Sequence, residues 1–264
     1  MTDLDAALGA IRIPDLAGKA ILVTGASTGI GAAVAVALGR QGAWVAVHYN
    51  ASPEPAQAIA DSIGRDGGTA VLVRGDMSQD GKSEEVVEEA ARALGGLDGL
   101  INNAGGMLGR VPFAEMTDAH YERVMNLNAR SVLAATRAAV PFLKRTRGFI
   151  INTTSIAARN GGAGGATLYA ASKGFVSTIT HGHAKEFAGF GIRVNAVSPG
   201  VITTPFHERY STSEQLEAAR KTVPMDRLGT AEECVGAYLF LASETLSSYV
   251  TGQVIEVNGG QLMP

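Results

Sequence analysis

Cysteine is almost missing from this chain, since Cys234 is the only one among 264 residues. One cysteine excludes an internal disulfide and a cysteine-rich zinc site. Charge is scarce as well: 18% of the residues are charged, and 25 acidic against 22 basic residues give a net charge of -3. This balance lacks the basic footprint that nucleic-acid binding needs, so we expect no nucleic-acid partner.

Neither a targeting leader nor a membrane span is expected. Asp3 and Asp5 stand where a secretory signal would carry positive residues. The most apolar stretch, residues 21–38, is interrupted by glycine, serine and threonine, which is typical of a strand, a turn and a helix. We therefore expect a cytoplasmic protein that makes no contact with a membrane.

Apolar residues and glycine are plentiful instead. Apolar residues make up 46% of the chain, and 33 residues are glycine. A chain of this length and composition can bury a sizeable core and suits one globular domain. Residues 1–17 show weak periodicity and are expected to form an N-terminal tail, which leaves residues 18–264 as the domain.

Short apolar runs alternate with stretches of helical spacing along the whole domain. The predicted strands are residues 20–24, 43–48, 69–74, 97–102, 149–153, 193–198 and 254–257. The predicted helices are residues 29–41, 53–65, 83–94, about 117–145, 166–187, 212–221 and 231–242. This alternation predicts right-handed crossovers and an α/β fold: a single-domain, Rossmann-like, doubly wound parallel sheet of about seven strands with helices on both faces. A ligand crevice is expected at the carboxyl ends of the strands.

A glycine-rich turn joins the first predicted strand to the first helix. Its spacing is Gly-x3-Gly-x-Gly, and its candidate cofactor contacts are Gly25, Ser27, Thr28, Gly29, Ile30 and Gly31. Such glycines let a pyrophosphate approach the backbone, and the free N–H groups of the helix start face the anion. Any tight strand–helix turn can use glycine, but this place in a doubly wound pattern favours a dinucleotide cofactor.

The end of the second strand bears on which dinucleotide is bound. A site that prefers NAD usually has an acidic residue there, and the first carboxylate is Glu54. Tyr49, Asn50 and Ser52 can donate hydrogen bonds to a 2′-phosphate, although this segment holds no arginine or lysine to pair with it. We therefore expect NADP as the preferred cofactor, with NAD as the alternative.

Three polar residues form a candidate catalytic group. Tyr169 and Lys173 are four positions apart on a predicted helix, so the ammonium lies one turn from the phenol. A nearby cation is expected to lower the pKa of a phenol, which would make Tyr169 a general acid and base. Ser155 follows a predicted strand, where its hydroxyl can bond a substrate carbonyl. Each residue alone is more simply a surface or turn residue, but together they indicate hydride transfer at a carbonyl or alcohol carbon.

At this point the sequence resembles the short-chain dehydrogenase/reductase family over about residues 18–261. The motifs that carry the resemblance are Thr24-Gly-x3-Gly-Ile-Gly31, Asp76, Asn102-Asn-Ala-Gly105, Asn128, Ser155, Tyr169-x3-Lys173, Asn195, Ser198-Pro-Gly200 and Thr251-Gly-Gln-Val with Asn258-Gly-Gly260. So many motifs in one order make a chance match very improbable.

The resemblance implies roles for residues that the spacing alone does not assign. The implied cofactor contacts are Asp76, Met77, Asn103, Ala104, Gly105, Tyr169, Lys173, Pro199, Gly200, Ile202 and Thr204. Asp76 would bond the adenine. Asn128 would complete the catalytic group by holding a water that connects Lys173 to solvent. The family also implies a homotetramer.

Substrate recognition is expected to lie in three variable segments. The first is a substrate lid at about residues 202–227, where Phe206, His207, Tyr210 and Met225 are candidate contacts. The others are residues 106–108 and the glycine-rich stretch 160–165. The expected substrate is a 3-oxoacyl thioester-like ketone. The alternatives are a sugar, polyol or other secondary alcohol, and, from another class, a non-catalytic dinucleotide-sensing protein.

The histidines and a group of basic residues need a separate interpretation. The five histidines show no metal-ligand spacing, and His181 and His183 point to different helix faces, so no metal is expected. The basic residues Lys144, Arg145, Arg147, Arg130 and Lys185 are candidates for docking an acidic acyl carrier protein. Those at 144–147 also suit the C-terminus of a helix, whose dipole favours positive charge.

Overall fold

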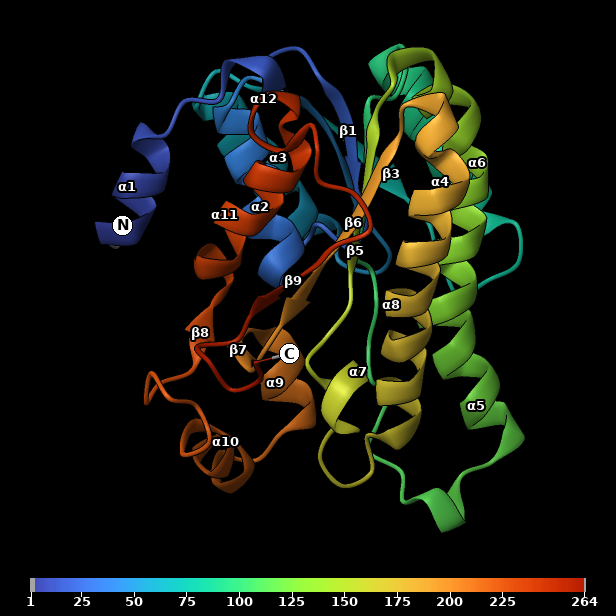
Figure 1. The fold of residues 1–264 in the computed structure, drawn as a ribbon, viewed down its shortest axis with the longest axis vertical. Coiled ribbons are helices and arrows are strands. Elements are labelled where there is room, and N and C mark those ends of the chain that lie inside the picture. Colours follow the sequence, from blue (N-terminus) through green and yellow to red (C-terminus); the bar gives the residue numbers. More distant parts are fainter. Residues whose placement is uncertain (1–2, 264) are drawn as a thin grey trace.

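A single seven-stranded parallel sheet forms the centre of the computed structural model, which describes residues 3–263 (Figure 1). Its strands are β1 (Ala20–Val23), β2 (Trp44–Tyr49), β3 (Thr69–Arg74), β4 (Gly99–Asn102), β5 (Phe149–Thr153), β6 (Arg193–Pro199) and β9 (Val254–Val257). They lie in the order β3-β2-β1-β4-β5-β6-β9. The predicted doubly wound fold is thereby confirmed, with the direction of winding reversing between β1 and β4.

Helices cover both faces of the sheet (Figure 1). One layer consists of α2 (Gly29–Arg40), α3 (Pro53–Arg65) and α11 (Ala231–Ala242). The opposite layer consists of α4 (Lys82–Leu94), α6 (Ser131–Thr146) and α8 (Thr167–Phe187). Because each strand is covered on both sides, β1, β4, β5 and β6 are buried along their whole length.

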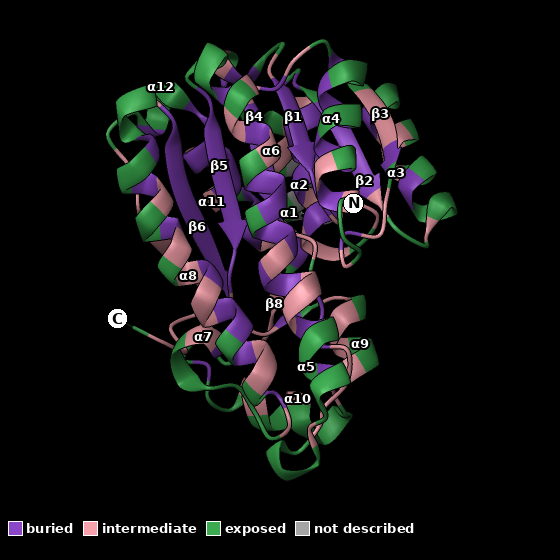
Figure 2. Cartoon of the chain, turned by 90° about the vertical axis from the view of Figure 1, so that its right-hand side faces the viewer, coloured by how far each residue is buried: buried purple, intermediate pink, exposed green. Residues whose placement is uncertain are grey.

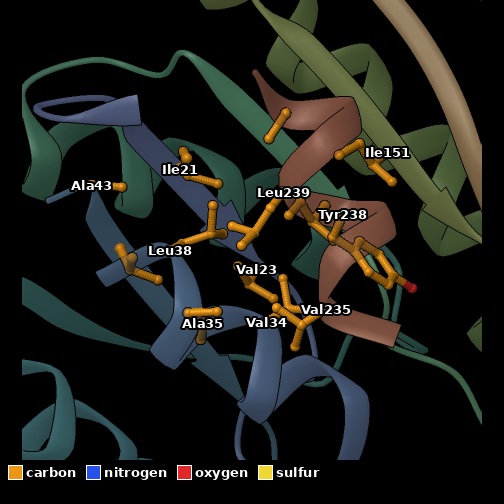
Figure 3. Close-up of a cluster of buried hydrophobic side chains, with 14 of the residues drawn as sticks. Ile21, Val23, Val34, Ala35, Leu38, Ala43, Ile151, Val235, Tyr238 and Leu239 are labelled. Carbon is orange, nitrogen blue, oxygen red and sulfur yellow. The ribbon is translucent and has the colours of Figure 1, made fainter. Parts of the chain in front are cut away.

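Two apolar clusters, one on each face, hold the layers together. On the α2 and α11 face, Ile21, Val34 and Leu38 pack with Val235 and Leu239, as Figure 3 shows. Leu22, Leu100 and Ile150 of the strands' other side pack on α4, α6 and α8. Burying a leucine or isoleucine side chain contributes roughly 1.5–3 kcal/mol, so these clusters supply much of the stability.

The carboxyl ends of the strands open toward a less buried group of elements, drawn in the lower half of Figure 2. This group includes α5 (Asp118–Met125), α7 (Ala157–Asn160), α9 (Pro205–Tyr210) and α10 (Ser213–Arg220). A two-stranded parallel pair, β7 (Ile202–Thr203) with β8 (Gly229–Thr230), joins the two ends of the segment that carries α9 and α10.

The structure differs from the sequence expectation in the long helix, in the N-terminal segment and in the short elements α7, α9, β7 and β8, which the sequence did not predict. The predicted long helix over about 117–145 is three pieces: α5, a π-helical turn at Asn126–Arg130, and α6. The segment expected to be a tail contains α1 (Asp3–Ala10) and a 3-10 turn at Pro14–Leu16. Leu16 is buried, and the Asp15 carboxylate accepts hydrogen bonds from the Ser243 hydroxyl and the Thr245 N–H. The last short helix, α12 (Glu244–Ser247), is held by this contact.

Among residues 3–263, none of the helices combines the length and the apolar character that crossing a membrane requires.

Candidate active site

A cleft of about 1010 Å³ lies at the carboxyl ends of the strands. It begins where the winding reverses, between the turn after β1 and the segment after β4, and extends outward to α9 and α10. This is the place at which doubly wound sheets bind their ligands. All the predicted catalytic and cofactor-binding residues line it except Gly31 and Asn128. Gly31 faces the Gly25 carbonyl oxygen, and Asn128 hydrogen-bonds to Gly106, so both lie immediately behind the wall.

The glycine-rich turn fits a pyrophosphate. A β-carbon at Gly25 would come 2.9 Å from the Ala104 Cα, and one at Gly31 would come 2.3 Å from the Gly25 carbonyl oxygen. Only glycine therefore allows the turn to close this tightly. Thr28 is the N-cap of α2, but its side chain accepts no hydrogen bond from the helix. The first N–H groups of α2 are left to an anion at the mouth of the turn.

The segment after β4 is tied to this turn. The Thr24 hydroxyl accepts hydrogen bonds from the N–H groups of Asn103 and Ala104. The Asn103 amide donates to the carbonyl oxygens of Thr24 and Gly25 at 2.9 and 3.1 Å. These bonds fix Asn103, Ala104 and Gly105 as one wall of the cofactor half of the cleft.

Asp76 lies after β3 at the other end of this half. Its carboxylate accepts hydrogen bonds from the Ser78 N–H, the Ser78 hydroxyl and the Gln79 amide. Burial alone would raise the pKa of Asp76, but these bonds and one from Asn50 outweigh it and hold the pKa below its ordinary value. Asn50 therefore contacts the residue expected at the adenine and is partly committed to it.

Ser155, Tyr169 and Lys173 meet in the middle of the cleft. Tyr169 and Lys173 are one turn apart on α8, and Ser155 follows β5 and hydrogen-bonds to Tyr169. The Lys173 ammonium donates to the Thr153 carbonyl oxygen at 2.8 Å and lies 5.9 Å from the centre of the Tyr169 ring. The Thr154 hydroxyl donates to the Lys173 carbonyl oxygen, which fixes α8 against β5.

Burial dominates the ionisation of this pair. It raises the pKa of Tyr169 to about 12, although the Ser155 hydrogen bond opposes the rise. It lowers the pKa of Lys173 to about 8. The expected lowering of the phenol pKa by the ammonium was wrong for this arrangement. The ammonium lies 5.9 Å from the centre of the Tyr169 ring, and the desolvation of the buried phenolate dominates the pKa of Tyr169. Tyr169 is therefore a protonated phenol at neutral pH.

Asn128 lies in the π-helical turn and is fully buried. Its amide nitrogen donates to the carbonyl oxygens of Gly106 and Val124, and its amide oxygen accepts from the Gly106 N–H. Both amide hydrogens are thus used by the protein, and a water-holding role for Asn128 stays a prediction. Such π-turns occur frequently at functional sites. This one places the Asn128 side chain against Gly106 in the loop that follows β4.

The outer half of the cleft is formed by the 202–227 segment and its neighbours. The Phe206 ring lies 5.6 Å from the Tyr169 ring and 5.1 Å from the Tyr210 ring. His207 hydrogen-bonds to the Ser211 hydroxyl at 3.0 Å, and burial together with the nearby Arg110 lowers the pKa of His207. Phe206, His207 and Tyr210 line the cleft as expected, whereas Met225 does not and is 60% exposed.

Arg110 is a cleft residue that the sequence did not indicate. Its guanidinium donates to the Tyr210 carbonyl oxygen at 2.6 Å and to the Gly164 carbonyl oxygen at 3.1 Å. It joins the end of α9 to the glycine-rich stretch 160–165, both of which line the substrate half. No motif signals such a contact, because its partners are backbone atoms about 50 and 100 positions away.

The basic docking candidates have partners of their own. Arg130 donates to the Asp80 carboxylate at 2.5 Å and to the Ser78 carbonyl oxygen at 2.6 Å. The Lys144 ammonium lies 3.4 Å from the centre of the Phe190 ring. These contacts within the chain are a structural reason for both residues that requires no carrier protein.

Comparison with known proteins agrees with the geometry of the cleft. A family model described as enoyl-(acyl carrier protein) reductase matches residues 25–261. The 3-oxoacyl-acyl-carrier-protein reductase of Thermotoga maritima is 37% identical over 246 residues, which are 93% of this chain and 98% of that protein. General stress protein 39 of Bacillus subtilis is 38% identical over 250 residues, covering 94% of this chain and 86% of that protein.

Solved structures give the same answer. The NADH-dependent reductase A1-R′, responsible for alginate metabolism, matches with a TM-score of 0.88 and 38% identity over 95% of this chain and 100% of its own. A short-chain dehydrogenase from Burkholderia cenocepacia in complex with NADP matches with a TM-score of 0.87 and 32% identity, covering 94% of this chain and 99% of its own. A1-R′ is also similar to this chain in its complex with NAD, at a TM-score of 0.86.

The chain belongs to the short-chain dehydrogenase/reductase family. It is an NAD(P)-dependent oxidoreductase, so the alternative of a non-catalytic sensing protein is not supported.

Proposed function

We propose that this enzyme reduces a ketone to a secondary alcohol, with Tyr169 as the proton donor. The observation that carries the proposal is the meeting of Ser155, Tyr169 and Lys173 beside the cofactor half of the cleft. Burial keeps the phenol of Tyr169 protonated at neutral pH, and that is the form a reduction needs. Oxidation of an alcohol would require the phenolate instead.

Separate groups of residues bind the cofactor and transfer the proton. The turn from Gly25 to Gly31 and the start of α2 hold the pyrophosphate, and Asp76 holds the adenine. When bound, the nicotinamide cofactor supplies a hydride to the carbonyl carbon. Ser155 bonds the carbonyl oxygen as negative charge develops on it, and Tyr169 donates its proton to that oxygen. The Lys173 ammonium is the group on α8 that can return a proton to the phenol.

The preferred cofactor in this proposal is NADPH. The end of β2 and residues 50–53 carry no carboxylate that would repel a 2′-phosphate. Arg74, at the end of β3, pairs with Tyr49 in the sheet register, so both side chains leave the sheet on the same face. Arg74 is exposed and makes no ion pair with the described residues. Arg74 lies outside the lining of the main cleft and borders a smaller pocket with Asn50, Asp76, Glu85 and Glu89. We propose that it pairs with the 2′-phosphate, because the pairing of β2 with β3 brings it beside Tyr49.

The proposed substrate is a 3-oxoacyl thioester-like ketone. Met107, Leu108, Leu127 and Ile156 give the outer half of the cleft an apolar wall that suits an acyl chain. Arg110 and Arg209 also line this half, where the described lining residues include no carboxylate, and this charge suits the phosphate of a thioester carrier. The relative in Thermotoga maritima is named for this reaction.

A sugar, polyol or other secondary alcohol is the second candidate. Asn160, Gln215, Thr222 and Gln261 place neutral hydrogen-bonding groups along the same half of the cleft. The similarity to A1-R′, which acts in alginate metabolism, favours this class as well.

Oxidation rates of NADPH and NADH with acetoacetyl-CoA test the proposal. We expect turnover that is faster with NADPH than with NADH, and Arg74→Gln is expected to narrow the difference. Absence of turnover with both cofactors would contradict the thioester substrate. Reduction of NADP⁺ or NAD⁺ in the presence of sugars or polyols would then favour the second candidate.

We also propose that the chain assembles as a homotetramer. Phe113 is 72% exposed, and Tyr121 and Leu133 are exposed nearby in the chain, on α5 and α6. Tyr249 and Met263, near the C-terminus, are fully or mostly exposed. Large apolar side chains in two separate regions support two kinds of contact between subunits.

A further inference from the structure

His48 is a buried histidine that none of the expected roles uses. It lies in β2, one residue before the end of the strand, and its side chain is only 2% exposed. Its side chain is on the α4 face of the sheet, the same face as its register partner Val73. His48 is among the residues that border the cofactor half of the cleft.

Both ring nitrogens of His48 are engaged by backbone groups. Nδ1 accepts a hydrogen bond from the Gly25 N–H at 2.9 Å, and Nε2 lies 3.0 Å from the Gly75 carbonyl oxygen. A carbonyl oxygen only accepts, so Nε2 carries the proton and Nδ1 is the acceptor. The neutral ring with this one tautomer satisfies both partners. Burial, which lowers the pKa of His48 to about 4, keeps the ring neutral at physiological pH.

The two partners belong to opposite ends of the cofactor half. Gly25 is the first glycine of the turn after β1, and Gly75 immediately precedes Asp76 after β3. Because β2 lies between β1 and β3 in the sheet, the His48 ring reaches sideways in both directions from the middle strand. The His48 carbonyl oxygen also accepts a hydrogen bond from the Ala26 N–H at 2.8 Å. The ring thus fixes the spacing between the pyrophosphate turn and the adenine segment.

We propose that His48 is a positioning residue for the adenosine half of the dinucleotide. It acts through Gly25 and Gly75 and does not itself touch the cofactor. The inference rests on dinucleotide binding, which the family establishes, and is independent of the ketone substrate. Its failure can therefore be distinguished from failure of the proposed substrate by measuring binding alone.

The variant that tests this most directly is His48→Phe. A phenyl ring fills a similar volume but leaves the Gly25 N–H and the Gly75 carbonyl oxygen without their partners. His48→Asn keeps a polar side chain of shorter reach and is expected to be intermediate. The matched control is His120→Phe, since His120 is also buried, at 6% exposure, but lies on α5 outside the cleft lining.

The readout is the Kd of three ligands measured by titration: NADPH, ADP and reduced nicotinamide mononucleotide. In His48→Phe we expect the Kd of NADPH and of ADP to rise by about tenfold or more, while that of the mononucleotide changes by less than about twofold. His120→Phe is expected to leave all three unchanged. A merely structural role for His48 would weaken all three ligands together.

Two results would overturn the proposal. One is an unchanged Kd for NADPH and ADP in a folded His48→Phe protein. The other is an equal loss of affinity for the mononucleotide and for ADP. If His48→Phe does not fold, His48→Asn is judged by the same two criteria, so the test still gives an answer.

Discussion

Burial acts in opposite directions on the two ionisable residues at the centre of the cleft. It raises the pKa of Tyr169 to about 12 and lowers that of Lys173 to about 8, and in both cases the neutral form is favoured. Tyr169 keeps its proton at neutral pH, whereas Lys173 loses its own only slightly above it. The proton that limits the reaction at alkaline pH is therefore expected to be that of Lys173.

Turnover in the reducing direction should fall as pH rises through about 8. The lysine ammonium is the protonated form, so each pH unit above its pKa removes about nine-tenths of the ammonium that remains. The measurement is kcat at saturating NADPH and ketone between about pH 6 and about pH 10. A profile that stays flat across that range would contradict this role for Lys173. Lys173→Met should abolish this fall in turnover near pH 8, together with most of the activity.

Among the elements, α2 has a strict requirement for glycine at one position. Its Gly31 faces the Gly25 carbonyl oxygen, which a β-carbon would approach to 2.3 Å. Gly64 in α3 is also helical, but a β-carbon there would meet nothing within 4 Å. The same Gly→Ala substitution should therefore have opposite effects in the two helices.

Gly31→Ala is expected to destabilise the protein by about 1–3 kcal/mol, the usual cost of overpacking, and to weaken dinucleotide binding. Gly64→Ala is expected to stabilise it by about 0.5–1 kcal/mol, because alanine is the better helix former. Thermal or denaturant unfolding, with a Kd for NADPH, measures both. Equal effects of the two substitutions would refute the close-packed turn.

The elements also show what the sequence could and could not predict. The short apolar runs and the glycines between them were sufficient to predict the seven strands, because a strand that is buried on both faces needs a continuous apolar run. The π-turn at Asn128 was missed, since one widened turn does not interrupt the helical spacing on either side. His48, Arg74 and Arg110 could not be singled out from the sequence for a common reason: the neighbours of each are backbone groups or strand partners far away in the sequence. Tyr169 and Lys173 could be predicted as a pair because their spacing is local, and the structure places both in the cleft with Ser155.

In the whole molecule, the carboxyl ends of the strands bring distant segments together around the cleft. The apolar side chains exposed around α5 and α6 and near the C-terminus predict self-association. Light scattering coupled to size-exclusion chromatography should give a mass near four times 27.2 kDa. Replacing Phe113 and Tyr121 by polar residues is expected to lower that mass without unfolding the subunit. A monomeric wild-type protein would refute the tetramer.

Whether Tyr169 delivers the proton in ketone reduction is decided by measuring binding and turnover separately in Tyr169→Phe. We expect an unchanged Kd for NADPH, because phenylalanine removes only the phenol oxygen and leaves the pyrophosphate and adenine contacts in place. We expect kcat for acetoacetyl-CoA, or for whichever ketone the wild type reduces, to fall by about a hundredfold or more. A Tyr169→Phe enzyme that binds NADPH and keeps its kcat would show that Tyr169 is not the proton donor.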